Sequence, residues 1–170
     1  MPIHRLNHAV LYVRDAERSA HFYEEVLGFR QVMAFPGAVF LQAEGSTNDH
    51  DLGLFSIGEG AAASGAGRQT VGLYHLAWEV DTLNDLAEIG RKLSEVGALS
   101  GATDHGTTKA LYAKDPDGLD FEVSWLVPAD LLTGDIEVAA RPLDLAAESE
   151  RFGGDTLGGI GVSRPRTVIA

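Results

Sequence analysis

The second half of the sequence repeats the pattern of the first half. Each copy opens with a strand-like run containing a histidine, His8 and then His75, and continues into an amphipathic segment of helical spacing. That segment ends at a glycine, Gly28 and then Gly97. The histidines are 67 residues apart (75 − 8) and the glycines 69 (97 − 28), and three further strand-like runs follow each helix. We therefore expect an α+β fold of two tandem βαβββ modules.

The duplication also sets the expected boundaries. We expect one domain over residues 1–127, made of modules 1–57 and 71–127. The segment between the modules, residues 58–70, reads GEGAAASGAGRQT and is expected to be a flexible linker. No third copy follows, so residues 128–170 are a C-terminal extension, with a short helix around 143–151 and a glycine-rich tail expected to be loosely ordered.

Two local details follow from the same pattern. Each first strand carries its histidine in the middle of an otherwise alternating run. Each helix follows an aspartate, Asp15 or Asp81, which is the expected N-cap.

Composition excludes several classes of function. The formal net charge is −12 and the chain has no basic cluster, so a nucleic-acid-binding face is not expected. The sequence contains no cysteine, which excludes disulfides, thiolate metal sites and a cysteine nucleophile. No apolar run approaches the ~20 residues that a membrane span needs, and no secretory signal is visible at the start. These features fit a cytoplasmic protein that binds neither nucleic acid nor a membrane.

Three residues of the duplicated pattern are unusual for core positions. His8 and His75 occupy equivalent places in the two modules, and Glu122 stands in the otherwise apolar run LDFEVSW of the last strand. A buried carboxylate is costly unless it is paired. Two imidazoles and one carboxylate are the ligand set of non-haem Fe(II) sites, and the same set also suits Zn(II) or Mn(II). The alternative is that both histidines are hydrogen-bonded core residues and that Glu122 pairs with an arginine.

The motifs LNHAVLYVRD, FYEEVLGF, YHLAWEV and DPDGLDFEVSW resemble those of the vicinal oxygen chelate superfamily, also called the glyoxalase/bleomycin-resistance/dioxygenase fold. The resemblance spans residues 1 to about 127. It implies two βαβββ modules whose mixed sheets curve around a central metal site. The implied metal ligands are His8, His75 and Glu122.

Members of this superfamily catalyse different reactions, so the fold does not settle the activity. Alignment of the two modules places Gly53 opposite Glu122 (122 − 53 = 69). The resemblance implies that glyoxalase-like isomerases bind their metal through four protein ligands, one of them a glutamate at the position that Gly53 occupies here. Three protein ligands instead leave room for a bidentate substrate and O2, as in a single-domain extradiol dioxygenase.

The resemblance to extradiol dioxygenases also implies three catalytic residues. Tyr112 precedes Glu122 by ten residues (122 − 112 = 10), with His105 upstream of it and His50 beside Asp51 at the start of a strand. Tyr112 would hydrogen-bond the deprotonated substrate oxygen, His50 would act as the acid/base, and His105 would orient the substrate. The implied cofactor is Fe(II), with Mn(II) as the alternative ion.

The expected reaction is cleavage of a catechol with O2 to a hydroxymuconic semialdehyde type of product, and the resemblance also implies a homo-oligomer. The runner-up is a metal-dependent isomerase, epimerase or lyase of the same superfamily. A drug-sequestering protein similar to bleomycin-resistance proteins is a third reading, but those proteins lack the metal ligands that are present here.

Overall fold

The computed structural model describes residues 3, 5–67, 69–132 and 140–159. The chain forms two compact units. Unit 1 consists of Met1–Gly65 together with Asp115–Leu119, and unit 2 consists of Ala66–Lys114 together with Asp120–Ala170. No helix among the described residues has the length and apolar character that crossing a bilayer requires.

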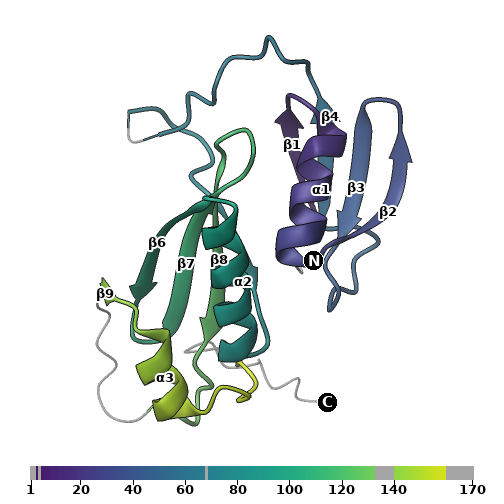
Figure 1. Ribbon diagram of the computed structural model, residues 1–170. Helices are drawn as coiled ribbons and strands as arrows, with labels where there is room; N and C mark the ends of the chain where they lie inside the picture. Colours follow the sequence, from purple (N-terminus) through teal and green to yellow (C-terminus); the bar gives the residue numbers. More distant parts are fainter. Residues whose placement is uncertain (1–2, 4, 68, 133–139, 160–170) are drawn as a thin grey trace. The chain divides into compact units, whose positions relative to one another are not determined.

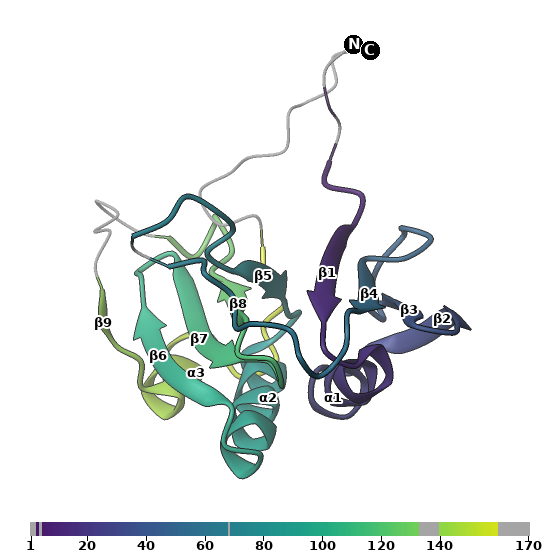
Figure 2. The same ribbon diagram turned by 90° about the horizontal axis from the view of Figure 1, so that it is seen from above.

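Unit 1 is a four-stranded sheet with one helix on one of its faces (Figures 1 and 2). Its elements are β1 (Ala9–Val13), α1 (Ala16–Leu27), β2 (Arg30–Phe35), β3 (Ala38–Gln42) and β4 (Leu52–Ser56). The strand order is β1-β4-β3-β2, and β1 runs parallel to β4 while the other neighbours are antiparallel. A parallel pair requires a crossover connection, which α1 and the two intervening strands supply.

Unit 2 repeats this arrangement and extends it (Figures 1 and 2). Its elements are β5 (Leu76–Glu79), α2 (Leu83–Glu95), β6 (Leu99–Asp104), β7 (Thr108–Lys114), β8 (Asp120–Leu126), β9 (Arg141–Pro142) and α3 (Leu145–Phe152). The strand order is β5-β8-β7-β6-β9, with β5 parallel to β8. The α+β fold of two βαβββ modules is therefore confirmed.

Helix α1 begins and ends as the sequence predicts. The Asp15 side chain accepts hydrogen bonds from the backbone N–H groups of Glu17 and Arg18, which have no partner inside the helix. Gly28 closes the helix in the left-handed region, at φ 73°, where a side chain would be strained. The buried stripe of the helix, Ala16, Ser19, Ala20, Tyr23 and Val26, has the spacing of one helical face.

The N-cap expected for the second helix is wrong by one residue. Thr82, not Asp81, caps α2. The Thr82 side chain accepts from the backbone N–H of Asp85, and the Asp85 carboxylate accepts from the backbone N–H of Thr82. This reciprocal capping box satisfies two backbone donors at once, which a cap at Asp81 would not do.

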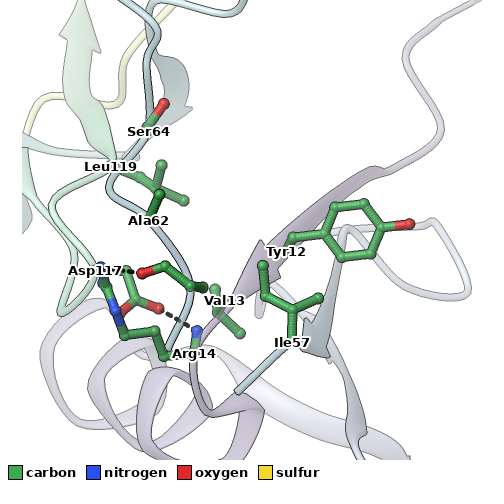
Figure 3. Close-up of a pocket in the computed structure, with 9 residues that line it drawn as sticks. Tyr12, Val13, Arg14, Ile57, Ala62, Ser64, Asp117 and Leu119 are labelled. Carbon is green, nitrogen blue, oxygen red and sulfur yellow. Dashed lines mark hydrogen bonds and ion pairs between the residues drawn. The ribbon is translucent and has the colours of Figure 1, made fainter. Parts of the chain in front are cut away.

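The turn between β7 and β8 packs with unit 1 rather than with the strands that it connects (Figure 3). Asp117, whose side chain is only 6% exposed, accepts from the Arg14 backbone N–H at 2.8 Å, from Arg14 Nη1 at 2.9 Å and from Arg18 Nη2 at 2.5 Å. Burial alone would raise the pKa of Asp117, but the hydrogen bonds and charges of Arg14 and Arg18 hold it below its usual value.

Residues 140–159 of the extension pack against unit 2. Strand β9 pairs with β6, and the Trp125 indole donates from Nε1 to the Thr156 carbonyl at 3.2 Å. Gly159 lies so close to Pro128 that an added Cβ would be 2.8 Å from its backbone Cα, so a larger residue would not fit. The tail expected to be loosely ordered starts after the helix; its residues 160–170 lie outside the described residues.

We predict that Asp117→Asn lowers the free energy of unfolding by about 2 kcal/mol at neutral pH, since charge-assisted hydrogen bonds are lost. The pKa of Asp117 is lower in the folded than in the unfolded state, so its contribution is present above about pH 4 and is lost as pH falls through the folded value. Urea unfolding at several pH values measures this difference. The exposed Asp130→Asn is the control. A difference between Asp117→Asn and the parent that does not shrink in acid would contradict the prediction.

Candidate functional site

The two equivalent histidines do not lie in the middle of their strands, which corrects the expectation from the sequence. His8 stands directly before β1, which starts at Ala9, and His75 directly before β5, which starts at Leu76. The ladder between β1 and β4 begins at the pair Ala9 and Leu52, so no partner strand extends the pairing to His8. The two histidines therefore hold equivalent positions, each directly before the first residue of a parallel strand pair.

One face of the unit 1 sheet carries no helix (Figure 2), and the residues on it are apolar and aromatic. Cross-strand partners lie on the same face of a sheet, and the register links one row of residues across all four strands: Val10, Gly53, Phe40 and Met33. A second row on this face is Tyr12, Phe55, Ala38 and Phe35. Four side chains of this face are at least half exposed: Val10, Tyr12, Met33 and Phe35. Within unit 1 they are therefore accessible to a ligand.

His8 and His50 meet beside this face. Their ring centroids lie 4.4 Å apart, and Phe40 packs edge-on against His50 at 5.1 Å. The Nδ1 atom of His8 is 2.7 Å from Asn7 Oδ1. When Nδ1–H donates to this oxygen, Nε2 keeps its lone pair and is free to bind a metal.

A hydrogen-bonded loop holds His50 in place. The Asp51 carboxylate accepts from the Ala43 backbone N–H at 2.9 Å, from Ser46 Oγ at 2.8 Å and from Asn48 Nδ2 at 2.7 Å. His50 Nδ1 lies 3.1 Å from an Asp49 carboxylate oxygen. A hydrogen bond from the His50 backbone N–H is the main cause that lowers the pKa of Asp49, which keeps that carboxylate ionised as an acceptor.

Unit 2 brings together the other four residues that the sequence singled out. The equivalent row of its sheet is Ala77, Glu122, Tyr112 and Gly101. The His75 side chain reaches this row, with Nε2 3.3 Å from Glu122 Oε2. Tyr112 Oη lies 2.9 Å from His105 Nε2, so one hydrogen bond joins the row to the turn between β6 and β7.

Tyr112 is held in its protonated form. Burial raises the pKa of Tyr112, and the negative charge of Glu122 and a hydrogen bond with it raise that pKa further. A hydroxyl that stays protonated can donate a hydrogen bond to an anionic oxygen placed beside it. Tyr112 therefore keeps one hydroxyl proton to donate, and Glu122 and His105 are the neighbouring polar groups.

The register supports the alignment of the two modules. Val10 lies two residues after His8 and pairs with Gly53, while Ala77 lies two residues after His75 and pairs with Glu122. Gly53 and Glu122 thus hold the same place in their modules. In module 1 the row carries glycine and phenylalanine where module 2 carries Glu122 and Tyr112.

The side chains present fit a divalent metal. Two ligands bound side by side at about 2.1 Å from one ion are separated by about 3.0–3.4 Å, which agrees with the 3.3 Å between His75 Nε2 and Glu122 Oε2. This separation is long for a charge-assisted hydrogen bond. The other nitrogen of His75, Nδ1, is buried and has no hydrogen-bond partner among the described residues.

The predicted ligand trio draws on both units. Over the residues that the structure describes, neither unit by itself gathers three histidine or carboxylate side chains that could hold a metal. His8 and His50 come together in unit 1, and His75, Glu122, Tyr112 and His105 in unit 2. The joint site of His8, His75 and Glu122 stays a prediction.

A cavity of about 240 Å³ in unit 1 lies apart from these residues (Figure 3). It forms at the end of β1, where the segment after β4 and the turn that carries Asp117 meet. Its lining is Tyr12, Val13, Arg14, Ile57, Ala61, Ala62, Ser64, Asp117 and Leu119. None of the six residues predicted for the site lines it, and the polar groups of Arg14 face Asp117 and the Ala61 carbonyl.

Sequence reasoning missed three residues that contact the predicted ones. Asn7 bonds His8, Phe40 packs against His50, and Tyr74 packs against His75 with ring centroids 4.6 Å apart. Phe40 holds the place of Tyr112 in the register, but the two are 72 residues apart (112 − 40), so the offset of 69 that aligns Gly53 with Glu122 does not find it. Asn7 and Tyr74 directly precede the two histidines, but adjacency alone does not indicate contact.

Comparison with known proteins identifies the family. A family model described as the Glyoxalase/Bleomycin resistance protein/Dioxygenase superfamily matches residues 5–123. The chain belongs to this superfamily. The resemblance drawn from the sequence motifs is thereby confirmed.

Two curated members of the superfamily are similar in sequence. A protein of Bacillus subtilis (strain 168) named "Catechol-2,3-dioxygenase" is 32% identical over 119 residues, which cover 69% of this chain and 40% of the relative. A "Biphenyl-2,3-diol 1,2-dioxygenase 3" of Rhodococcus globerulus is 33% identical over 115 residues, which cover 67% of this chain and 59% of the relative. The chain thus matches only about half the length of these relatives.

Solved structures of superfamily members share the fold. A glyoxylase/bleomycin resistance protein/dioxygenase domain from Frankia sp. EAN1pec has a TM-score of 0.57 and 21% identity, covering 72% of this chain and 92% of that one. The fosfomycin resistance protein FosX from Listeria monocytogenes has a TM-score of 0.55 and 17% identity, covering 72% of this chain and 93% of that one. At these identities the likeness concerns the fold alone.

Proposed function

We propose that this chain cleaves the ring of a catechol with O2, using Fe(II) bound by His8, His75 and Glu122. The observation that carries the proposal is the difference between the modules at one register position, Gly53 in one and Glu122 in the other. A glycine supplies no fourth ligand, so positions on the ion remain open for a bidentate substrate and O2. The names of the two sequence relatives support the same reaction class. When bound, the metal would supply the redox chemistry of O2 and a positive charge beside the substrate oxygens.

Tyr112 would bind the substrate through its hydroxyl. Its raised pKa keeps the proton on Oη at neutral pH, so it can donate a hydrogen bond to a substrate oxygen that has lost its own proton. His105 Nε2, 2.9 Å from Oη, would fix the orientation of that hydroxyl. This pair would favour the anionic form of the catechol over the neutral form.

His50 would move protons at the substrate. With Nδ1–H directed at Asp49, its Nε2 can take a proton from the substrate hydroxyl and return a proton later in the reaction. The adjacent sheet face, where Phe40 contacts Phe35 and His50, offers an apolar surface on which an aromatic ring could pack.

Oxygen dependence tests the proposal as a whole. Iron-loaded protein should consume O2 in the presence of a catechol and form a yellow ring-fission product. Turnover of a non-aromatic substrate without O2, supported by Ni(II) or Zn(II), would instead assign the chain to the isomerases and lyases of the superfamily.

The three metal ligands should behave as one group. Replacing His8, His75 or Glu122 singly by alanine should abolish tight Fe(II) binding, since an ion that loses one of three protein ligands is no longer held in geometry. Metal analysis after desalting gives the iron content of each variant, with His21→Ala, at an exposed position of α1, as the control. If Glu122→Ala still bound one iron per chain and were active, Glu122 would not be a metal ligand.

The role of His50 is separable from metal binding. His50→Ala should keep its iron and lose on the order of 10²–10⁴ in kcat, the usual contribution of a positioned proton-transfer group. Steady-state oxygen uptake at saturating catechol measures the loss. If kcat were unchanged, His50 would have no part in proton transfer.

Gly53→Glu tests whether the open position faces the metal. A Cβ at Gly53 would meet Phe40 and Val10 at 3.4 Å, which is van der Waals contact, so the substitution is tolerable at its base. The new carboxylate should occupy the open position, so added metal should raise Tm by mass action while ring cleavage is lost. Thermal melting with and without metal separates this from simple overpacking, which metal would not rescue. A folded variant that cleaves catechol at the parent rate would show that Gly53 does not face the metal.

A further inference from the structure

We propose that helix α3 of the C-terminal extension positions His105 through a partly buried chain of charges, Glu148 to Lys109 to Asp104. The positioning itself is a property of unit 2 and needs no substrate. Its effect on turnover rests on the proposed function, in which His105 orients the hydroxyl of Tyr112.

Lys109 is a buried charge for which the proposed reaction has no use. Its side chain is fully buried, on strand β7 three residues before Tyr112 and therefore on the opposite face of the sheet. Nζ forms ion pairs with Asp104 and, at 2.8 Å, with Glu148 Oε2. The Phe152 ring of α3 lies 5.6 Å from Nζ. A buried ammonium is costly without such partners, so Lys109 ties β7 to both carboxylates.

The carboxylate of Asp104 shapes the turn that carries His105. Asp104 is the last residue of β6, and its Oδ1 accepts from the Gly106 backbone N–H at 2.8 Å and from Lys109 Nζ. The His105 backbone N–H donates to the Thr108 carbonyl at 2.9 Å, which closes the turn. Because Lys109 orients the Asp104 carboxylate, it also fixes the conformation of the residue between Asp104 and Gly106.

The extension reaches the same strand end from a second side. In β9, Arg141 pairs with Asp104 and Pro142 with Thr103 in an antiparallel ladder. The chain then enters α3, which is capped by the Asp144 side chain and carries Glu148 one turn further on. Backbone pairing from β9 therefore reaches Asp104, the residue before His105, directly, and α3 reaches it through Lys109.

Glu148 is the member of this chain of charges that can be removed with least disturbance. Without it the fully buried Lys109 ammonium has one carboxylate fewer to offset its desolvation, so opening of this strand end to water becomes easier and the turn loosens. Alanine is the best helix former, so Glu148→Ala does not weaken α3 through propensity. Glu148→Gln keeps a polar oxygen beside Nζ without the charge, and Glu150→Ala removes an exposed carboxylate from the same helix as the matched control.

Amide hydrogen exchange of the metal-free full-length protein tests the positioning directly. In Glu148→Ala the amides of His105 and Gly106 should exchange at least about tenfold faster than in the parent, since local opening becomes easier. Glu148→Gln should be intermediate and Glu150→Ala unchanged, and the amide of Val123 in β8 should keep its rate in all three. Unchanged exchange at His105 and Gly106, or equal acceleration at Val123, would overturn the proposal.

A double-mutant cycle tests the consequence for turnover. With iron-loaded protein, Glu148→Ala should lower kcat for a catechol about tenfold, because misplacing an orienting group by a fraction of an ångström is costly. In a His105→Ala background the same change should have no further effect, since Glu148 acts through His105. Additive losses, or unchanged kcat despite faster exchange, would overturn the proposal. If the parent cleaves no catechol, the proposed function fails, and the exchange rates alone decide whether Glu148 positions His105.

Discussion

The parallel pairing of the first and last strands in each module is the constraint on which the other features depend. It aligns the residue two places after each histidine with a fixed position on the last strand, Gly53 or Glu122. The antiparallel neighbours then extend each row, to Phe40 in one module and Tyr112 in the other. A one-residue slip would turn every one of these side chains to the opposite face. The two modules thus present different side chains, Gly53 and Phe40 or Glu122 and Tyr112, at equivalent positions.

Much of this arrangement could be read from the sequence. The ten-residue offset between Tyr112 and Glu122 has a simple cause, because the two residues are direct partners across a hairpin whose turn is centred on Asp117. Period-two alternation placed Glu122 on the face opposite to Phe121 and Val123, and these two are buried while Glu122 is not. The side-chain alternation of a strand and the pairing across a hairpin have fixed periods, and such periods are visible in a single sequence.

Other parts could not be read in this way. The ion pair between Lys109 and Glu148 joins residues 39 apart (148 − 109) across a helix and a strand, and no periodicity connects them. The contact of Asn7 with His8 depends on side-chain rotamers, which strand patterns do not specify. The glycines after α3 were expected to be flexible chain, yet a residue larger than glycine would not fit at Gly159, because Pro128 lies against it. Tertiary contact, not local propensity, decides these positions.

The turn that carries Asp117 has a consequence for the synthesis of the protein. Unit 1 has its strands and helix by Gly65, but Arg14 and Arg18 receive their carboxylate only when Asp117 has been made. Leu119, the end of that turn, follows Gly65 by 54 residues (119 − 65), which takes several seconds at roughly 5–20 residues per second. During synthesis, unit 1 can therefore gain the ion pairs of Asp117 only after most of the second module has left the ribosome's active site. The two compact units therefore do not coincide with two consecutive stretches of sequence.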